Sequence, residues 1–179
     1  MRRIYVFFIF MGIFSAAYQL GSMSTVDLEE AEKFIGEFEE LIKDITAIEI
    51  FTHNASLALP MFIPGFGVAW GLFSAWSTGY AFAAIVLLNP LLSGIPALSI
   101  LFLSPFGLME LTAYSLGTSR SYILFSLIMR KKPISPQLKM TVIEIGIMVG
   151  LLLAGGFIEF YMIEMIEENE TPEWLFGLE

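Results

Sequence analysis

Residues 97–129 read ALSILFLSPFGLMELTAYSLGTSRSYILFSLIM and decide how this chain crosses a membrane. As one helix these 33 residues would be ~50 Å long, too long for one crossing of a ~30 Å hydrocarbon core and too short for two. Pro105 lacks an N–H donor and disfavours helix at Ser104. The stretch therefore predicts a helix broken at 104–107, with a short half-inserted segment before the break and a crossing over 105–129.

The composition indicates that most of the remaining chain also lies in the membrane. Of 179 residues, 56% are hydrophobic and only 15% are charged, whereas soluble domains carry about 25% charged residues. The mean hydropathy is +0.76, and apolar runs of about 18 residues or more recur. These properties predict an all-α, polytopic transmembrane bundle.

Five crossings are predicted within one membrane domain that covers residues 1–179. The apolar run 51–92 has 42 residues, or ~63 Å of helix, so it should cross twice and turn around 74–79. The predicted spans are 4–23, 50–73, 78–92, the broken 97–129, and 140–163.

The charge distribution orients these spans in the cell membrane. Six basic residues fall on one side of the five-crossing arrangement, which the positive-inside rule assigns to the cytoplasm; they are Arg2, Arg3, Arg130, Lys131, Lys132 and Lys139. Nine acids in 24–49 and six in 164–179 fall on the other side, out of eighteen in the chain. The N-terminus is therefore expected in the cytoplasm and the C-terminus outside.

The acidic segment 24–49 has helical periodicity. Apolar residues recur near 3.6-residue spacing from Leu28 to Ile45, after Thr25 or Asp27 as a possible N-cap. An amphipathic external helix is expected, whose acidic face either attracts cations and basic partners or is simply solvated.

Two interpretations of the first apolar segment remain open. Arg2-Arg3, an apolar core and Ser15-Ala16-Ala17 resemble a cleavable signal peptide. A retained first helix is the alternative, because Gly12 and Ala16 form a small-residue pair suited to packing on another helix.

Glu110 is the acid placed most deeply in a predicted span. An ionised carboxylate there costs roughly 2.5–3.5 kcal/mol on insertion scales, so a partner, water or an ion should offset it. We predict an intramembrane polar joint of Asn54, Pro105, Gly107, Glu110 and Tyr114. The joint either holds the bend by hydrogen bonding or binds a proton or cation, as broken helices with an acid do in transporters.

Small residues and a second pair of charges complete the candidate residues. Close helix packing is predicted along two stripes of small residues, Gly67, Gly71, Ala75 and Gly79, and Gly146, Gly150 and Ala154. Each stripe is expected either inside the bundle or at a homodimer interface. Arg120, the one base within a span, is expected either to snorkel to the interface or to pair with Glu144, and Glu159 is placed where it could join the acidic outer surface.

No site for a metal, cofactor or catalytic group is predicted. The chain has no cysteine and one histidine, His53, so only Glu110 and His53 are weak candidates for metal binding. No hydrolase, zinc-protease or phosphate-loop motif occurs. The protein is not expected to be an enzyme or to bind nucleic acid.

Two motifs resemble the stage II sporulation protein M family. Phe51-Thr-His-Asn54 opens one span, and Ser104-Pro-Phe-Gly107-Leu-Met-Glu110 matches a Pro-His-Gly-x-x-Glu signature, with Phe106 in place of the histidine. Thr78-Gly79 stands where Asn-Gly is common in the family. The resemblance, over about 48–132, implies a multi-spanning membrane protein, and the founding member is a scaffold in envelope remodelling.

Two functional hypotheses follow. The first is a membrane scaffold that acts through contacts between helices and with partners; these would be the lipid bilayer, a second copy in a homodimer or small homo-oligomer, and other membrane or envelope proteins. The second is a channel or transporter for an ion or small solute, with Glu110 as its cation or proton site.

Overall fold

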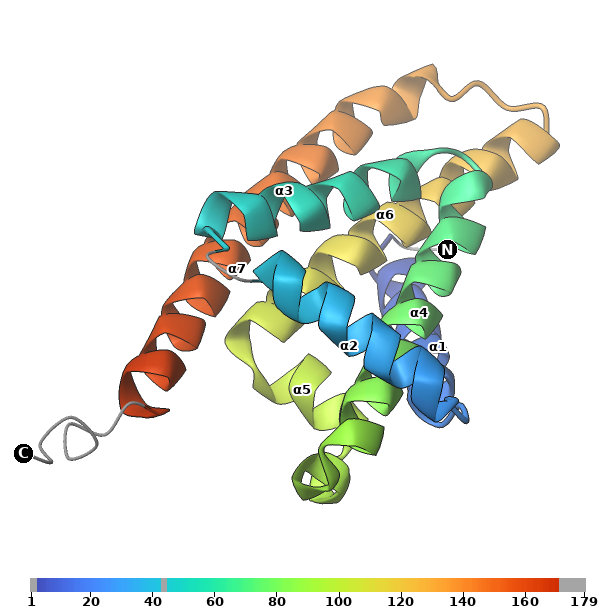
Figure 1. The fold of residues 1–179 in the computed structure, drawn as a ribbon. Coiled ribbons are helices and arrows are strands. Elements are labelled where there is room, and N and C mark those ends of the chain that lie inside the picture. Colours follow the sequence, from blue (N-terminus) through green and yellow to red (C-terminus); the bar gives the residue numbers. More distant parts are fainter. Residues whose placement is uncertain (1–2, 43–44, 171–179) are drawn as a thin grey trace, which may run out of the picture.

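Every regular element of the described chain is a helix (Figure 1). A computed structural model describes residues 3–42 and 45–170, and no strand occurs among them. The all-α prediction is thus confirmed for this part of the chain. The elements in it are α1 Arg3–Ser22, α2 Leu28–Ile42, α3 Ala47–Ala58, the 3-10 helix η1 Leu59–Phe62, α4 Phe66–Leu88, the 3-10 helix η2 Pro90–Gly94, α5 Ala97–Leu103, α6 Pro105–Met129 and α7 Ser135–Glu170.

The helices that can cross a membrane are fewer than predicted. α1, α4 and the part of α7 over Ser135–Met165 are long and apolar enough, and the bent pair of α5 and α6 is a fourth candidate. α3 has 12 residues, or about 18 Å of helix, which is shorter than the hydrocarbon core. By length and composition the described residues therefore supply three or four spans, where five were predicted.

The break at Ser104 lies where proline chemistry predicts it. The axes of α5 and α6 meet there at 87°. Ser104 caps α6, because its side chain accepts a hydrogen bond from Gly107 N at 3.0 Å while its hydroxyl donates to Ile100 O at 2.6 Å. A Cβ at Gly107 would lie 2.6 Å from Ile100 O, so glycine allows α5 to fold back closely on the start of α6.

The turn predicted around 74–79 is wrong. α4 runs without interruption through these residues, and the chain turns earlier, between η1 and α4. Pro60 begins η1, and Gly65 adopts φ +78°, a left-handed conformation that other residues rarely adopt. The small residues near 75–79 are therefore packing positions and not turn positions.

The first small-residue stripe is an internal seam. Its members, Gly67, Gly71, Ala75 and Gly79, are all buried. A Cβ at Gly79 would lie 2.0 Å from Tyr18 O, and one at Gly21 would lie 2.0 Å from Trp76 O. α1 and α4 thus meet backbone to backbone, which is how helices associate where lipid supplies no hydrophobic drive.

The second stripe lies on the outside of α7. A Cβ at Gly146 or Gly150 would meet nothing within 4 Å, and Ala154 is exposed. The pair on α1 also differs from its prediction, because Gly12 and Ala16 are both exposed. Small-residue spacing alone did not distinguish an internal seam from an outward face.

The chain passes back and forth between two ends of the bundle. Arg3, the first residue of α1, meets Glu144 in the first third of α7, so both helices run away from this end of the bundle. Near that end Ser121 of α6 donates to Ile63 O, just after η1, at 2.6 Å. Figure 1 shows α6 and α7 side by side, joined by the loop at the upper right, with α3 alongside them. α3 with η1 therefore runs with α6 and against α7.

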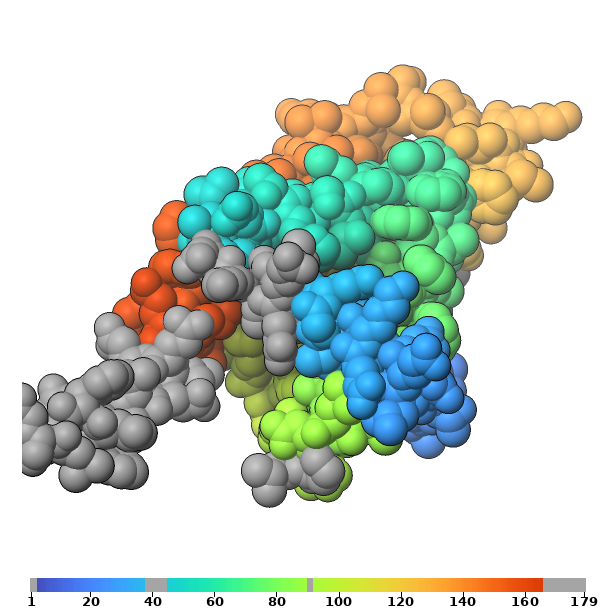
Figure 2. Space-filling view, in the orientation of Figure 1, coloured from blue at the N-terminus to red at the C-terminus, as the bar shows by residue number. Residues whose placement is uncertain are grey.

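α2 lies across the outside of α4, as Figures 1 and 2 show. Asp27 Oδ1 accepts a hydrogen bond from Glu29 N at 3.0 Å and so caps the helix start. Ala31 faces inward and is fully buried, while the Tyr80 hydroxyl donates to Glu30 Oε2 at 2.9 Å. The amphipathic helix of the prediction is present, packed by its apolar face on this bundle.

Candidate functional site

Glu110 is held by a side chain from the neighbouring helix α3. Asn54 Nδ2 donates to Glu110 Oε1 at 2.6 Å, and Asn54 itself is buried. The two residues are 56 positions apart, so this contact joins α3 to the first turns of α6, just after the break at Ser104. The side-chain amide of Asn54 therefore hydrogen-bonds the carboxylate, as a member of the predicted polar joint.

A cavity of about 470 Å³ opens beside this carboxylate. Glu110, Asn54, Tyr114 and His53 line it, and so does Glu159 from α7. Glu159 Oε2 is buried without a hydrogen-bond partner. The expectation that Glu159 belongs to the acidic outer surface is therefore wrong, because this residue faces the same cavity as Glu110.

Tyr114 contributes an aromatic wall to this cavity. Its ring stacks on that of Phe14 at a centroid distance of 5.6 Å. Among the described residues no hydrogen bond links Tyr114 to Glu110, although helical spacing allows one. Phe14 therefore ties α1 to the joint.

Two carboxyl groups facing one cavity define the chemistry that it permits. Both cannot be ionised without repulsion, so a proton or a cation between them is stabilising. Within the described residues no group of three or more His, Cys, Asp or Glu side chains is placed to hold a metal ion. The cavity therefore presents two carboxyl groups that can share a proton or a cation.

A second polar cluster surrounds Glu144, where two arginines share one carboxylate. Arg120 donates from Nε to Glu144 Oε2 at 2.7 Å and from Nη2 to Oε1 at 2.6 Å. Arg3 donates from Nε to Oε1 at 2.7 Å and from Nη2 to Oε2 at 3.0 Å. The structure thus brings Arg120 and Glu144 together as anticipated and adds Arg3 from α1.

Further donors and acceptors complete this three-helix cluster. Arg120 Nη1 donates to Gln137 Oε1 at 3.1 Å, and Arg3 Nη1 donates to Ser119 Oγ at 3.0 Å. Arg120 is 2% exposed, so its guanidinium depends on protein partners and not on water for its hydrogen bonds. From the sequence, Arg3 is expected on the cytoplasmic flank; its place at the very start of an apolar span was the available signal for a contact inside the bundle.

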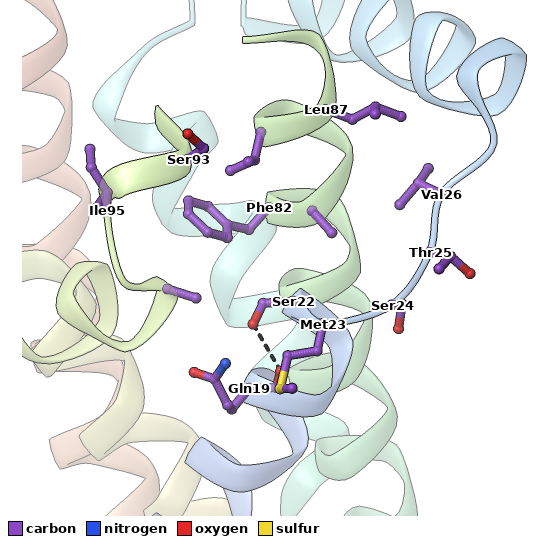
Figure 3. Close-up of a pocket in the computed structure, with 13 residues that line it drawn as sticks. Gln19, Ser22, Met23, Ser24, Thr25, Val26, Phe82, Leu87, Ser93 and Ile95 are labelled. Carbon is purple, nitrogen blue, oxygen red and sulfur yellow. Dashed lines mark hydrogen bonds between the residues drawn. The ribbon is translucent and has the colours of Figure 1, made fainter. Parts of the chain in front are cut away.

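The remaining large cavity is chemically different (Figure 3). It has a volume of about 490 Å³ and lies where the chain leaves α1, beside the end of α4 and η2. Its lining is apolar or neutral, with Phe82, Leu87 and Ile95 among the apolar members and Gln19 and Ser22 among the neutral polar ones, and it contains no titratable side chain. This cavity therefore offers no side chain for acid, base or metal chemistry.

The fold and these clusters define a polytopic helical membrane protein with polar joints inside its bundle. A family model described as stage II sporulation protein M matches residues 4–162, which is most of the chain. The chain therefore belongs to the stage II sporulation protein M family, as the motifs around Asn54 and Glu110 indicated. Neither the curated proteins nor the solved structures compared with the chain include a match.

Glu144→Gln should destabilise the protein more than Arg3→Gln. The first change leaves two guanidinium groups near each other without a counter-charge, and breaking such a buried pair costs about 3–5 kcal/mol. The second leaves the Arg120–Glu144 pair intact and removes a side chain that is 28% exposed. Thermal unfolding of purified protein in detergent measures both, and equal melting temperatures for the two variants would contradict this ranking.

Proposed function

We propose that this protein is a non-catalytic membrane scaffold that works through contacts between its helices and with partners, including a second copy of itself. The observation that carries the proposal is the outward stripe on α7, where Gly146 and Gly150 have no atom of their own chain in reach. Neighbouring apolar side chains such as Ile147 and Phe157 are exposed beside it. A helix with small residues on a lipid-facing side is suited to close approach by another helix.

The internal seams support the same proposal. α1 and α4 are locked backbone to backbone, and three helices converge on Glu144. A bundle that is rigid inside can present α7 on one side and the acidic helix α2 on another in a constant geometry. Envelope-remodelling activity of the kind ascribed to the founding family member is the wider role that we propose for such a surface.

We propose further that the chain crosses the membrane five times, with α3 and η1 as a short crossing beside α6. Arg3 and the basic residues 130–132 and 139 lie at one end of the bundle, which the positive-inside rule assigns to the cytoplasm. α2 would then lie outside the cell, with its acidic face in solution.

Cysteine labelling tests this orientation, because the chain has no cysteine of its own. A membrane-impermeant maleimide added to intact cells should label Glu32→Cys on α2, which is exposed. It should label Lys131→Cys, in the loop before α7, only after the cells are opened. The reverse pattern would place the C-terminus in the cytoplasm and overturn the assignment.

Cross-linking through a single cysteine tests the second copy. Gly150→Cys lies on the outward stripe of α7 and should form a disulfide-linked dimer in membranes under mild oxidation. Gly12→Cys is the matched control, since it is an equally open glycine on the outward face of α1 and should stay monomeric. Equal dimer yields at the two positions would mean random collision and would contradict a specific α7 interface.

The second candidate function is a cation or proton conduit, favoured by one observation: Glu110 and Glu159 face a common cavity with one carboxylate oxygen unpartnered. Broken helices with an acid at membrane depth line the ion sites of transporters. The scaffold remains the preferred proposal, because a single acid pair and one asparagine make a short polar path.

Flux through proteoliposomes separates the two candidates. For a scaffold, the parent protein gives no more proton or sodium flux than empty vesicles, and Glu110→Gln still forms the Gly150→Cys cross-link. For a conduit, the parent protein carries measurable flux that Glu110→Gln and Glu159→Gln each lower by tenfold or more. Flux that survives both substitutions would exclude this cavity as the pathway.

A further inference from the structure

A third polar site lies at the end of the bundle where α6 finishes and α7 begins. A cavity of about 350 Å³ opens there between α1, α6 and α7. Four of its lining residues are basic, and none of them is acidic; the bases are Arg3, Arg120, Arg130 and Lys132. Its volume falls in the range of about 300–1,000 Å³ that is usual for ligand sites.

The positive charge of this cavity is only partly balanced by the protein. Glu144 lies behind the lining and binds both Arg3 and Arg120, so it offsets one of four charges. Arg130 and Lys132 are exposed, and no described acid makes an ion pair with either. Three uncompensated positive charges therefore converge on one concave surface.

The lining also contains apolar side chains, namely Val6, Ile123, Leu127 and Met140. Ile128, next to Leu127 on α6, and Ile143, three residues after Met140 on α7, are exposed. A ligand that fits both the basic and the apolar part of the lining carries a negative head and a hydrocarbon tail.

We propose that this cavity binds the headgroup phosphate of an anionic phospholipid, with the acyl chain running along the apolar part of the lining. Arginine and lysine are the side chains that recognise phosphate oxygens by charge-assisted hydrogen bonds. Basic pockets between transmembrane helices on the cytoplasmic side suit anionic headgroups, which are concentrated in that leaflet. Tyr122 and Ser126, which also line the cavity, supply hydroxyl groups for the same headgroup.

The buried cluster beneath the cavity holds two of the bases in position for this headgroup. The carboxylate of Glu144 and the amide of Gln137 fix the guanidinium of Arg120. The headgroup would therefore contact bases that the Glu144 cluster holds in place, together with the exposed side chains of Arg130 and Lys132. This role is independent of whether the protein is a scaffold or a conduit.

The test is a lipid titration of the full chain, purified in non-ionic detergent and observed by native mass spectrometry. Phosphatidylglycerol should bind, whereas phosphatidylcholine with the same acyl chains should not compete with it. Arg130→Gln with Lys132→Gln should lower the affinity about 25-fold, since each base near such a headgroup contributes about fivefold. Lys131→Gln with Lys139→Gln is the matched control; it removes the same charge at the same end from residues outside the cavity lining and should leave the affinity unchanged.

Three results would overturn the proposal. Equal affinity for the two lipids would mean that the headgroup charge is not recognised. An equal loss in both double variants would mean general attraction to the basic end and no defined site. Displacement of bound phosphatidylglycerol by millimolar inorganic phosphate would mean that a free anion is the ligand instead of a lipid.

Discussion

Two guanidinium groups share the carboxylate of Glu144, and the arrangement of the bundle depends on this contact. It draws α1, α6 and α7 to one point at the basic end. Removing such groups from water is costly, and only full hydrogen bonding makes a buried ion pair tolerable. Gln137, Ser119 and the Leu116 carbonyl supply the remaining partners. Because a displaced helix would leave one of these charges unbalanced, the cluster favours the observed arrangement of α1, α6 and α7 over alternative arrangements.

Local physical chemistry made the break at Ser104 predictable, and the same reasoning failed at the turn. Proline removes a donor wherever it occurs, so Ser104-Pro105 has one structural meaning. Glycine and alanine have two meanings in a membrane, because they permit a turn and also permit close packing of helices. At residues 74–79 the small residues permit close packing of helices and do not form a turn. The stronger turn signal was the pair Pro60 and Pro64 with Gly65, whose positive φ only glycine adopts readily.

Contacts of the candidate site were predictable where both residues lie deep within predicted spans. They were not predictable where one residue lies near the end of a span. Asn54 with Glu110, and Arg120 with Glu144, were anticipated from depth within the spans and are in contact. Glu159 and Arg3 were missed, since each stands near a predicted end and was assigned to a polar flank. Glu110, which lines the same cavity as Glu159, is 49 residues away from it, and Glu144 is 141 residues away from Arg3; no local pattern encodes proximity at such separations. Helix phase and tilt decide such contacts, and both are set by packing across the whole bundle.

The sequence separations within the Glu144 cluster have a consequence for biosynthesis. Arg120 and Glu144 are 24 residues apart in a hairpin of two helices, so they can enter the bilayer already neutralised by one another. Arg3 is made first and its carboxylate 141 residues later. During that interval the first helix has no anionic partner from this cluster, and its guanidinium must remain among water and headgroups. When α7 is synthesised, Glu144 becomes available to Arg3, and this contact joins α7 to α1.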